Sequence, residues 1–234
     1  MTRFIKYLNE RNSLTPEKIF EEFTQVIEKK CSHYLTNIVN KNKGVKLYSG
    51  RKGAREIWFE GKVRKNRKPR DTIKEIHDIF NYCFQKNLGS KLRSESLFCG
   101  VNEIEARGYG EPYYIFPIGN DYKLWYHPEI KDLFLYFSES KPLIDLKIDL
   151  SLQISSSMVF KNMLSKMKKD EIYKNEVINY ICELTKGYKQ GLPPVYPYRE
   201  IMLDCKEYIA VNVDWIESKE SHKQIPKWDS WLWG

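Results

Sequence analysis

The stretch EIMLDCKEYIAVNV, residues 200–213, is the clearest strand signal in the chain and the starting point for its fold. It is rich in apolar and β-branched side chains, as in a largely buried strand, and it begins with a carboxylate. A second run, PYYIFPI at 112–118, has the same character and ends at a Gly-Asn-Asp turn. The short run from Tyr122 to Tyr126 follows that turn, so we expect these two strands to pair as a hairpin.

Helical signals surround these strands. Over residues 12–41 apolar side chains recur every three or four positions, Thr15 can cap the helix, and Pro16 suits its first turn. The same periodicity predicts further helices in three regions: from Asp71 or Thr72 to the Gly89-Ser90 pair, at 103–107, and twice within 156–187. Additional strand-like runs occupy residues 45–64 and 92–99.

This combination of elements predicts an α+β fold. A chain of 234 residues, of which 41% are hydrophobic and 14% aromatic, can bury one substantial core. We therefore expect one compact unit overall, with an N-terminal helical element at 1–44, a main domain at 45–234, and a helical insertion in that domain.

The expected location follows from the lack of membrane and export signals. The opening MTRFIKYLNERN is charged throughout, and no apolar run approaches the ~20 residues of a membrane-spanning helix. We expect a cytoplasmic protein of a bacterium or its phage. The cysteines are scattered, odd in number and never in a CxxC pair, so we expect them reduced, without a disulfide framework or a zinc site. They are Cys31, Cys83, Cys99, Cys182 and Cys205.

The formal net charge of +8 indicates a partner with negative charge, such as nucleic acid, an acidic protein or an anionic cofactor. Nine basic and two acidic side chains lie between Arg51 and Arg70, so this segment carries most of the excess. A solvated basic surface without a partner is the alternative.

Three short segments carry groups that could do chemistry. In VRKNRKPRDTIK, residues 63–74, an arginine at a strand end precedes the start of a helix, where its planar fork could grip a diphosphate. In LRSESLF, residues 92–98, a Ser-x-Ser alternation would place both hydroxyls on one strand face. In YPYREIML, residues 196–203, a glutamate opens an apolar strand directly after an aromatic loop.

The order and spacing of these segments resemble the arginine-serine-glutamate class of ADP-ribosyltransferases, which includes cholera toxin, pertussis toxin and the DNA-modifying pierisin relatives. Arg64 and Pro69 resemble the family's arginine motif. Ser94-Glu95-Ser96 and Ala106 resemble its serine strand and the helix that follows, and Glu200 resembles the glutamate of its catalytic strand. The resemblance spans roughly residues 57–213. It implies a split β-sheet core and cleavage of NAD.

Two positions depart from the family pattern. Asn66 and Lys68 stand where an acidic residue and an arginine are expected, so the functional arginine is Arg64 or Arg67, and Arg64 is favoured. Tyr198 stands two residues before the glutamate, where arginine-modifying members carry a second glutamate and DNA-modifying members often a glutamine. This departure disfavours an arginine side chain as the acceptor.

The resemblance implies roles for individual residues. Glu200 would stabilise the cationic ribose, Ser94 would hold Glu200 and the ribose, and Arg64 would anchor the phosphates, without a metal. The expected NAD-binding set is completed by further side chains, namely Arg67, Ser96 and Tyr109.

The acceptor of ADP-ribose is expected to be nucleic acid, because basic side chains near aromatic rings suit single-stranded DNA or RNA. The residues expected to bind it are Tyr188, Tyr196, Tyr198, Lys65 and Arg70. An acidic protein acceptor, an NAD hydrolase and a non-catalytic nucleic-acid-binding protein are the alternatives. A toxin, defence protein or phage effector would suit this chemistry, and the tail with Trp228, Trp231 and Trp233 could dock on the body or meet an antitoxin or regulatory partner.

Overall fold

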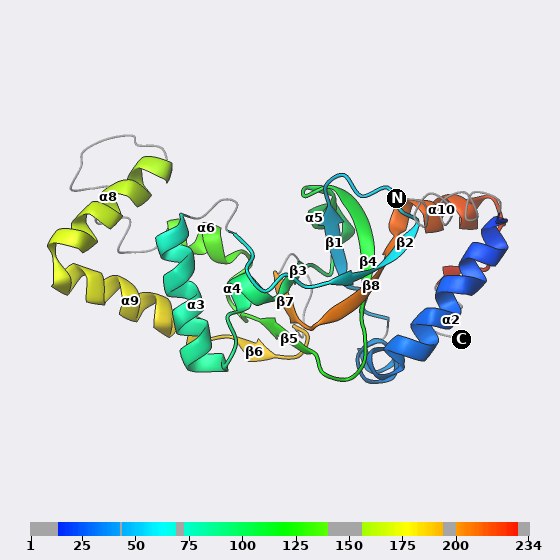
Figure 1. Ribbon diagram of the computed structural model, residues 1–234, viewed down its shortest axis with the longest axis horizontal. Coiled ribbons are helices and arrows are strands. Elements are labelled where there is room, and N and C mark those ends of the chain that lie inside the picture. The colour runs from blue at the N-terminus through cyan, green and yellow to red at the C-terminus, as the bar shows by residue number, and fades with distance from the viewer. Residues whose placement is uncertain (1–13, 43, 69–72, 140–155, 194–199, 229–234) are drawn as a thin grey trace, which may run out of the picture. The chain divides into compact units, whose positions relative to one another are not determined.

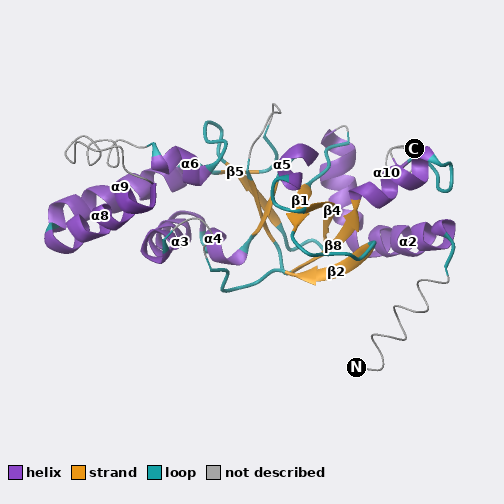
Figure 2. Cartoon of the chain, turned by 90° about the horizontal axis from the view of Figure 1, so that it is seen from above, coloured by secondary structure: helices purple, strands orange, loops and turns teal. Residues whose placement is uncertain are grey.

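The computed structural model describes residues 14–42, 44–68, 73–139, 156–193 and 200–228, and it is a mixed α+β protein with two four-stranded sheets (Figures 1 and 2). The chain divides into two compact units. Unit 1 comprises residues 1–62, 99–122 and 205–234, and unit 2 comprises residues 63–98 and 123–204. The N-terminal helix, which we expected to stand ahead of the main domain, belongs to unit 1 together with its sheet.

The sheet of unit 1 has the strand order β1-β4-β8-β2, and its neighbouring strands are antiparallel. Its strands are β1 (Tyr48–Arg51), β2 (Trp58–Lys62), β4 (Glu111–Pro117) and β8 (Glu207–Asn212). The accompanying helices are α2 (Pro16–Tyr34), which continues as a π turn and a 3-10 turn to Asn42, α5 (Glu103–Arg107) and α10 (Val213–Ser221). Helix α5 approaches β1 so closely that a Cβ on Gly50 would lie 1.9 Å from the Ala106 carbonyl oxygen, so only glycine fits there.

Aromatic packing holds α2 against this sheet. The apolar stripe of α2 that the sequence predicts is buried at Ile19, Phe20, Phe23 and Ile27. Trp228 is 1% exposed, stacks on Tyr114 of β4, and meets Phe20 and Phe23 edge-on or tilted. The docking of the tail is therefore confirmed for Trp228, whereas Trp231 and Trp233 lie outside the described residues.

Replacing Trp228 by alanine is expected to lower the free energy of unfolding by about 3–5 kcal/mol, because it empties a large aromatic site in the core. Urea denaturation of the wild type and the variant measures this difference. Tyr82→Ala is the control, since Tyr82 is 56% exposed and its removal leaves no cavity. A Trp228→Ala midpoint equal to that of the control would contradict this packing role.

The sheet of unit 2 has the strand order β3-β7-β5-β6. Its strands are β3 (Leu97–Cys99), which ends at the unit boundary, β5 (Lys123–Tyr126), β6 (Lys189–Gln190) and β7 (Ile201–Asp204). The helices of this unit are α3 (Lys74–Leu88), α4 (Leu92–Glu95), α6 (Leu133–Ser138), α8 (Ser156–Lys169) and α9 (Glu171–Lys186). Helix α3 ends at Gly89, whose φ of 78° closes it in the left-handed conformation, as the sequence predicts.

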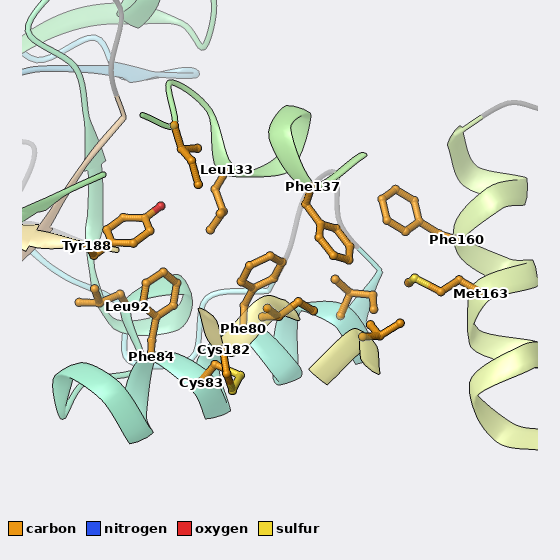
Figure 3. Packing of buried hydrophobic residues seen from close by; sticks show 14 of the residues in the cluster. Phe80, Cys83, Phe84, Leu92, Leu133, Phe137, Phe160, Met163, Cys182 and Tyr188 are labelled. Atoms are coloured by element: carbon orange, nitrogen blue, oxygen red, sulfur yellow. A yellow bond between two sulfur atoms is a disulfide. The ribbon is translucent and has the colours of Figure 1, made fainter. Parts of the chain in front are cut away.

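A cluster of aromatic and aliphatic side chains joins these helices (Figure 3). Phe80 and Phe84 of α3 face Phe137 of α6 and Tyr188, and Phe137 stacks on Phe160 of α8. The bounds of α3, α5, α8 and α9 confirm the helices expected at 71–89, at 103–107 and within 156–187, over the residues that the structure describes.

The strand pairing differs from expectation in two places. β4 and β5 do not form a hairpin, since β4 pairs with β1 and β8 whereas β5 pairs with β6 and β7. The expected single strand at 200–213 is interrupted after Asp204, and its halves β7 and β8 belong to different sheets. Both errors have one cause, because the chain crosses between the two units after Tyr122 and after Asp204.

The expectation that all cysteines are reduced is wrong for one pair. Cys83 of α3 and Cys182 of α9 form a disulfide, while Cys31, Cys99 and Cys205 are buried thiols. The two bonded residues are 99 positions apart, and they meet because α3 packs along α9. In the described part of the chain, no helix is long and apolar enough to cross a membrane.

Candidate functional site

Unit 2 contains a polar cluster around Ser94, which lies in the short helix α4 rather than in a strand. The expected alternation of two serine hydroxyls on one strand face is therefore wrong, because β3 begins only at Leu97. Ser96 is 3% exposed and donates its hydroxyl to the Leu92 carbonyl, so it serves the turn that ends α4. Ser94 is half-buried, and its hydroxyl is engaged by other side chains.

Two polar residues on the buried face of α3 hold Ser94. Asn81 donates from Nδ2 to Ser94 Oγ over 2.7 Å and accepts from the Ser94 backbone N–H over 3.1 Å. His77 lies one turn before Asn81, and its Nε2 is 2.9 Å from Ser94 Oγ. His77 is 4% exposed and Asn81 is 7% exposed, so these contacts are shielded from water.

Burial and nearby positive charge lower the pKa of His77. Removal of the imidazole from water is the largest cause, and the charge of Arg93 is the second. Asp78 acts in the opposite direction, followed by smaller contributions from the charge of Arg67, which lowers the pKa, and from the Arg67 backbone, which raises it. Because an unperturbed histidine titrates near pH ~6.5, His77 is neutral at physiological pH.

Two arginines share one aromatic ring beside Ser94. The guanidinium carbon of Arg67 lies 4.2 Å from the centroid of Phe98, and that of Arg93 lies 5.2 Å from it. The Arg67 backbone N–H also donates to the Ser94 carbonyl over 3.2 Å. Both guanidinium groups lie within the range of a cation–π interaction with this ring, so the pair places positive charge next to the serine.

Glu200 lies directly before β7 and is half-buried, with its Oε1 atom shielded from solvent. Its backbone N–H donates to the Lys131 carbonyl over 2.9 Å, which anchors the main chain at the strand start. β7 lies beside β3 in the sheet and contacts α4, the helix of Ser94. The structure therefore gathers Glu200, Ser94 and Arg67 within one unit.

Tyr188 is a buried neighbour of this cluster. Its ring contacts Phe84 and His127, and it is 6% exposed. Burial raises its pKa well above the ordinary value, Glu200 raises it further, and Arg93 lowers it. Glu200 and Arg93 are thus close enough to Tyr188 to affect its pKa. Its ring is part of the hydrophobic core and is not available for the stacking on a nucleic-acid base that we expected.

The remaining expected site residues that the structure describes are exposed. Arg64 and Lys65 belong to unit 2, and Tyr109, which is 54% exposed, belongs to unit 1. Arg70, Tyr196 and Tyr198 lie outside the described residues.

Three residues of the cluster were not predicted from the sequence: His77, Asn81 and Arg93. Polar side chains one turn apart on the otherwise apolar face of α3 were the available signal for the first two. Arg93 directly precedes Ser94 in the sequence, but nothing in that spacing shows that it shares a ring with Arg67.

Unit 1 holds an acidic group of Glu103, Asp214 and Glu217, whose carboxylate oxygens lie within 4.8 Å of one another. Arg107 forms salt bridges with both Glu103 and Asp214. The guanidinium partly offsets the negative charge of these two carboxylates, and Glu217 is exposed.

Comparison with known proteins finds no family model, no curated protein and no solved structure that matches this chain.

Proposed function

We propose that this chain is an NAD-dependent ADP-ribosyltransferase whose site is the Glu200, Ser94 and Arg67 cluster of unit 2. The observation that carries the proposal is the adjacency of the Glu200 strand to the helix of Ser94, with Arg67 bonded to the Ser94 backbone. The resemblance stated above requires an arginine, a serine and a glutamate. Arg67, Ser94 and Glu200 supply these residue types from three separate segments of the sequence, and all three belong to unit 2.

The chemistry requires a carboxylate that acts on the transition state. Breaking the bond between nicotinamide and ribose develops positive charge on the sugar, and a fixed carboxylate binds that cation more strongly than it binds the neutral ribose. Glu200 suits this role because its main chain is anchored and one carboxylate oxygen is shielded from water, where electrostatic attraction is stronger.

Arg67 and Arg93 are assigned to the diphosphate. Arg64 matches the arginine motif by position, but Arg67 is the arginine whose backbone donates to Ser94 and whose guanidinium lies over Phe98. A guanidinium can form paired hydrogen bonds to two phosphate oxygens through its N–H groups.

The acceptor is assigned to nucleic acid. Three exposed basic side chains lie close in the sequence to the diphosphate arginine Arg67: Arg64, Lys65 and Lys68. Such a segment attracts a phosphate backbone, and binding through it would weaken with increasing salt.

Incubation of the protein with NAD tests the proposed activity through released nicotinamide. Parallel reactions with labelled NAD contain RNA, DNA or total cell protein, and we expect the label in a nucleic-acid pool. No release of nicotinamide in any reaction would reject ADP-ribosyl transfer in favour of a binding protein. Release without a labelled macromolecule would indicate an NAD hydrolase, and label in protein alone would move the acceptor to protein.

Arg67→Lys is expected to raise the KM for NAD about tenfold or more, because lysine keeps the charge but loses the planar fork that binds two phosphate oxygens. Steady-state nicotinamide release measures this change. Arg55→Lys, an exposed arginine of unit 1, is the matched control. A tenfold rise in the KM for NAD in Arg64→Lys, together with a wild-type KM in Arg67→Lys, would assign the phosphate role to Arg64.

A further inference from the structure

The segment that joins β5 to α6 in unit 2 is folded around a histidine ring. His127, the first residue after β5, accepts at Nδ1 from the backbone N–H groups of Glu129 and Ile130, each over 3.1 Å. We propose that His127 is a positioning residue that holds Glu200 in place through this turn. The inference rests on the proposed function for the reaction that Glu200 serves.

The direction of the two hydrogen bonds follows from the groups that form them. A main-chain N–H only donates, so His127 Nδ1 accepts both bonds and carries no proton. The proton of the neutral ring is therefore on Nε2. Pro128 follows the histidine and has no N–H, so the first two donors of the turn are both bound by the ring.

The ring of His127 is closely enclosed. It is 8% exposed and lies edge-to-face with Tyr188, with the ring centroids 5.4 Å apart. A Cβ on Gly187 would lie 2.2 Å from His127 Nε2, so the ring lies directly against the backbone there. Ile130 is 3% exposed, and its buried N–H would be costly to leave without an acceptor. The ring and the turn therefore hold each other in one arrangement.

The turn presents a backbone carbonyl to Glu200. Lys131 directly follows Ile130, and its carbonyl accepts from the Glu200 N–H over 2.9 Å. The antiparallel pairing of β7 with β5 runs from Asp204 to Met202 and does not extend to Glu200. The Lys131 carbonyl thus anchors the main chain of Glu200 beyond the part of β7 that pairs with β5.

The other end of the segment has its own anchor. Asp132 follows Lys131 and accepts at Oδ1 from the Leu135 N–H over 2.8 Å, which caps α6. Lys131 lies between the cap of α6 and the turn around His127. Loss of the histidine should therefore release the Lys131 carbonyl on one side while the cap of α6 stays formed.

The effect on the proposed reaction should appear in kcat. A group that acts on the transition state must be held in its productive geometry, and a displacement of about 1 Å can lower a rate by orders of magnitude. The carboxylate of Glu200 has that role in the proposed mechanism, whereas the diphosphate is assigned to arginines. Loss of the turn should lower kcat for nicotinamide release and leave the KM for NAD near its wild-type value.

Two amide substitutions distinguish the two ring nitrogens. In His127→Asn the side-chain oxygen is attached to Cγ, as Nδ1 is in the ring, so it can accept from the turn. In His127→Gln the oxygen lies one bond further from the backbone, as Nε2 does. We expect kcat to fall about tenfold or more in His127→Gln and to stay near the wild-type value in His127→Asn. Equal losses in the two variants would overturn the role of Nδ1.

Amide hydrogen exchange follows the same contacts without NAD. In His127→Gln the N–H groups of Ile130 and Glu200 should exchange about tenfold or more faster than in the wild type, the scale of one lost hydrogen bond. In His127→Asn they should keep nearly the wild-type rates. The Leu135 N–H, bound by Asp132, is the internal control and should be unchanged. Wild-type exchange at Glu200 in His127→Gln, or equal acceleration at Leu135, would overturn the inference.

Long-range ¹H–¹⁵N NMR of the wild-type histidine rings needs no variant to fold except for assignment, which uses His127→Asn. We expect a protonated Nε2 and an unprotonated Nδ1 for His127 at neutral pH. A proton on Nδ1 overturns the inference. The exchange and NMR results decide whether His127 anchors Glu200 even if no nicotinamide is released, a result that would reject the proposed function alone.

Discussion

Glu200→Gln is expected to lower the rate of nicotinamide release by about 100-fold or more, the scale seen when one preorganised electrostatic group is removed from an active site. Glutamine has the shape of glutamate without its charge. The Glu200 backbone bond to Lys131 is made by the main chain, so the substitution leaves the start of β7 in place. The loss should appear in kcat more than in KM, because the carboxylate acts on charge that develops during bond breaking.

Glu207→Gln is the matched control for this experiment. Glu207 also begins a strand, β8, but it belongs to unit 1 and pairs with Lys62 on the surface, 3.2 Å away. We expect this variant to keep the wild-type rate. Wild-type release from Glu200→Gln, with the fold verified by circular dichroism, would show that the carboxylate does not act on the sugar.

Reduction of the Cys83–Cys182 disulfide is expected to lower the free energy of unfolding by about 4–5 kcal/mol. The bond closes a loop over a sequence separation of 99, and long loops lose the most entropy in the unfolded state. It joins α3 to α9 within the hydrophobic cluster, and α3 is also the helix that carries His77 and Asn81. Urea denaturation with and without a reductant measures the change.

The double variant Cys83→Ala/Cys182→Ala should unfold at the same urea concentration with and without reductant. Its three remaining cysteines, Cys31, Cys99 and Cys205, are thiols, so any effect of the reductant on them would appear in this variant too. Alkylation of the unfolded, unreduced wild type should label only those three. Labelling of all five cysteines would contradict the disulfide.

The expected site was partly accessible from the sequence. Glu200, Ser94 and Arg67 stand in motifs that could be recognised in order along the chain, and the structure gathers them in unit 2. The sequence leaves the functional arginine open between Arg64 and Arg67 and favours Arg64. The proposed preference for Arg67 rests on its contact with Phe98 and on its backbone hydrogen bond to Ser94, and those contacts join separate segments.

The sequence alone determined the α+β character, the helices and the approximate places of most strands. These follow from local causes: the apolar stripe of α2 repeats with the helical period, and Gly89 supplies the left-handed residue that ends α3. Such local preferences for helix, strand or turn depend on a residue and its neighbours in the sequence, and not on the segment that packs against them.

Only the tertiary structure decided the strand partners, the disulfide and the surroundings of Ser94. Cys83 meets Cys182 across 99 positions, and the Ser94 hydroxyl forms hydrogen bonds with His77 and Asn81 of α3, which lie 17 and 13 positions before it. Alternation along a strand shows which side chains are buried but not which strand lies beside it. Pairing between distant segments is determined when the whole core packs. The local sequence pattern therefore does not predict it.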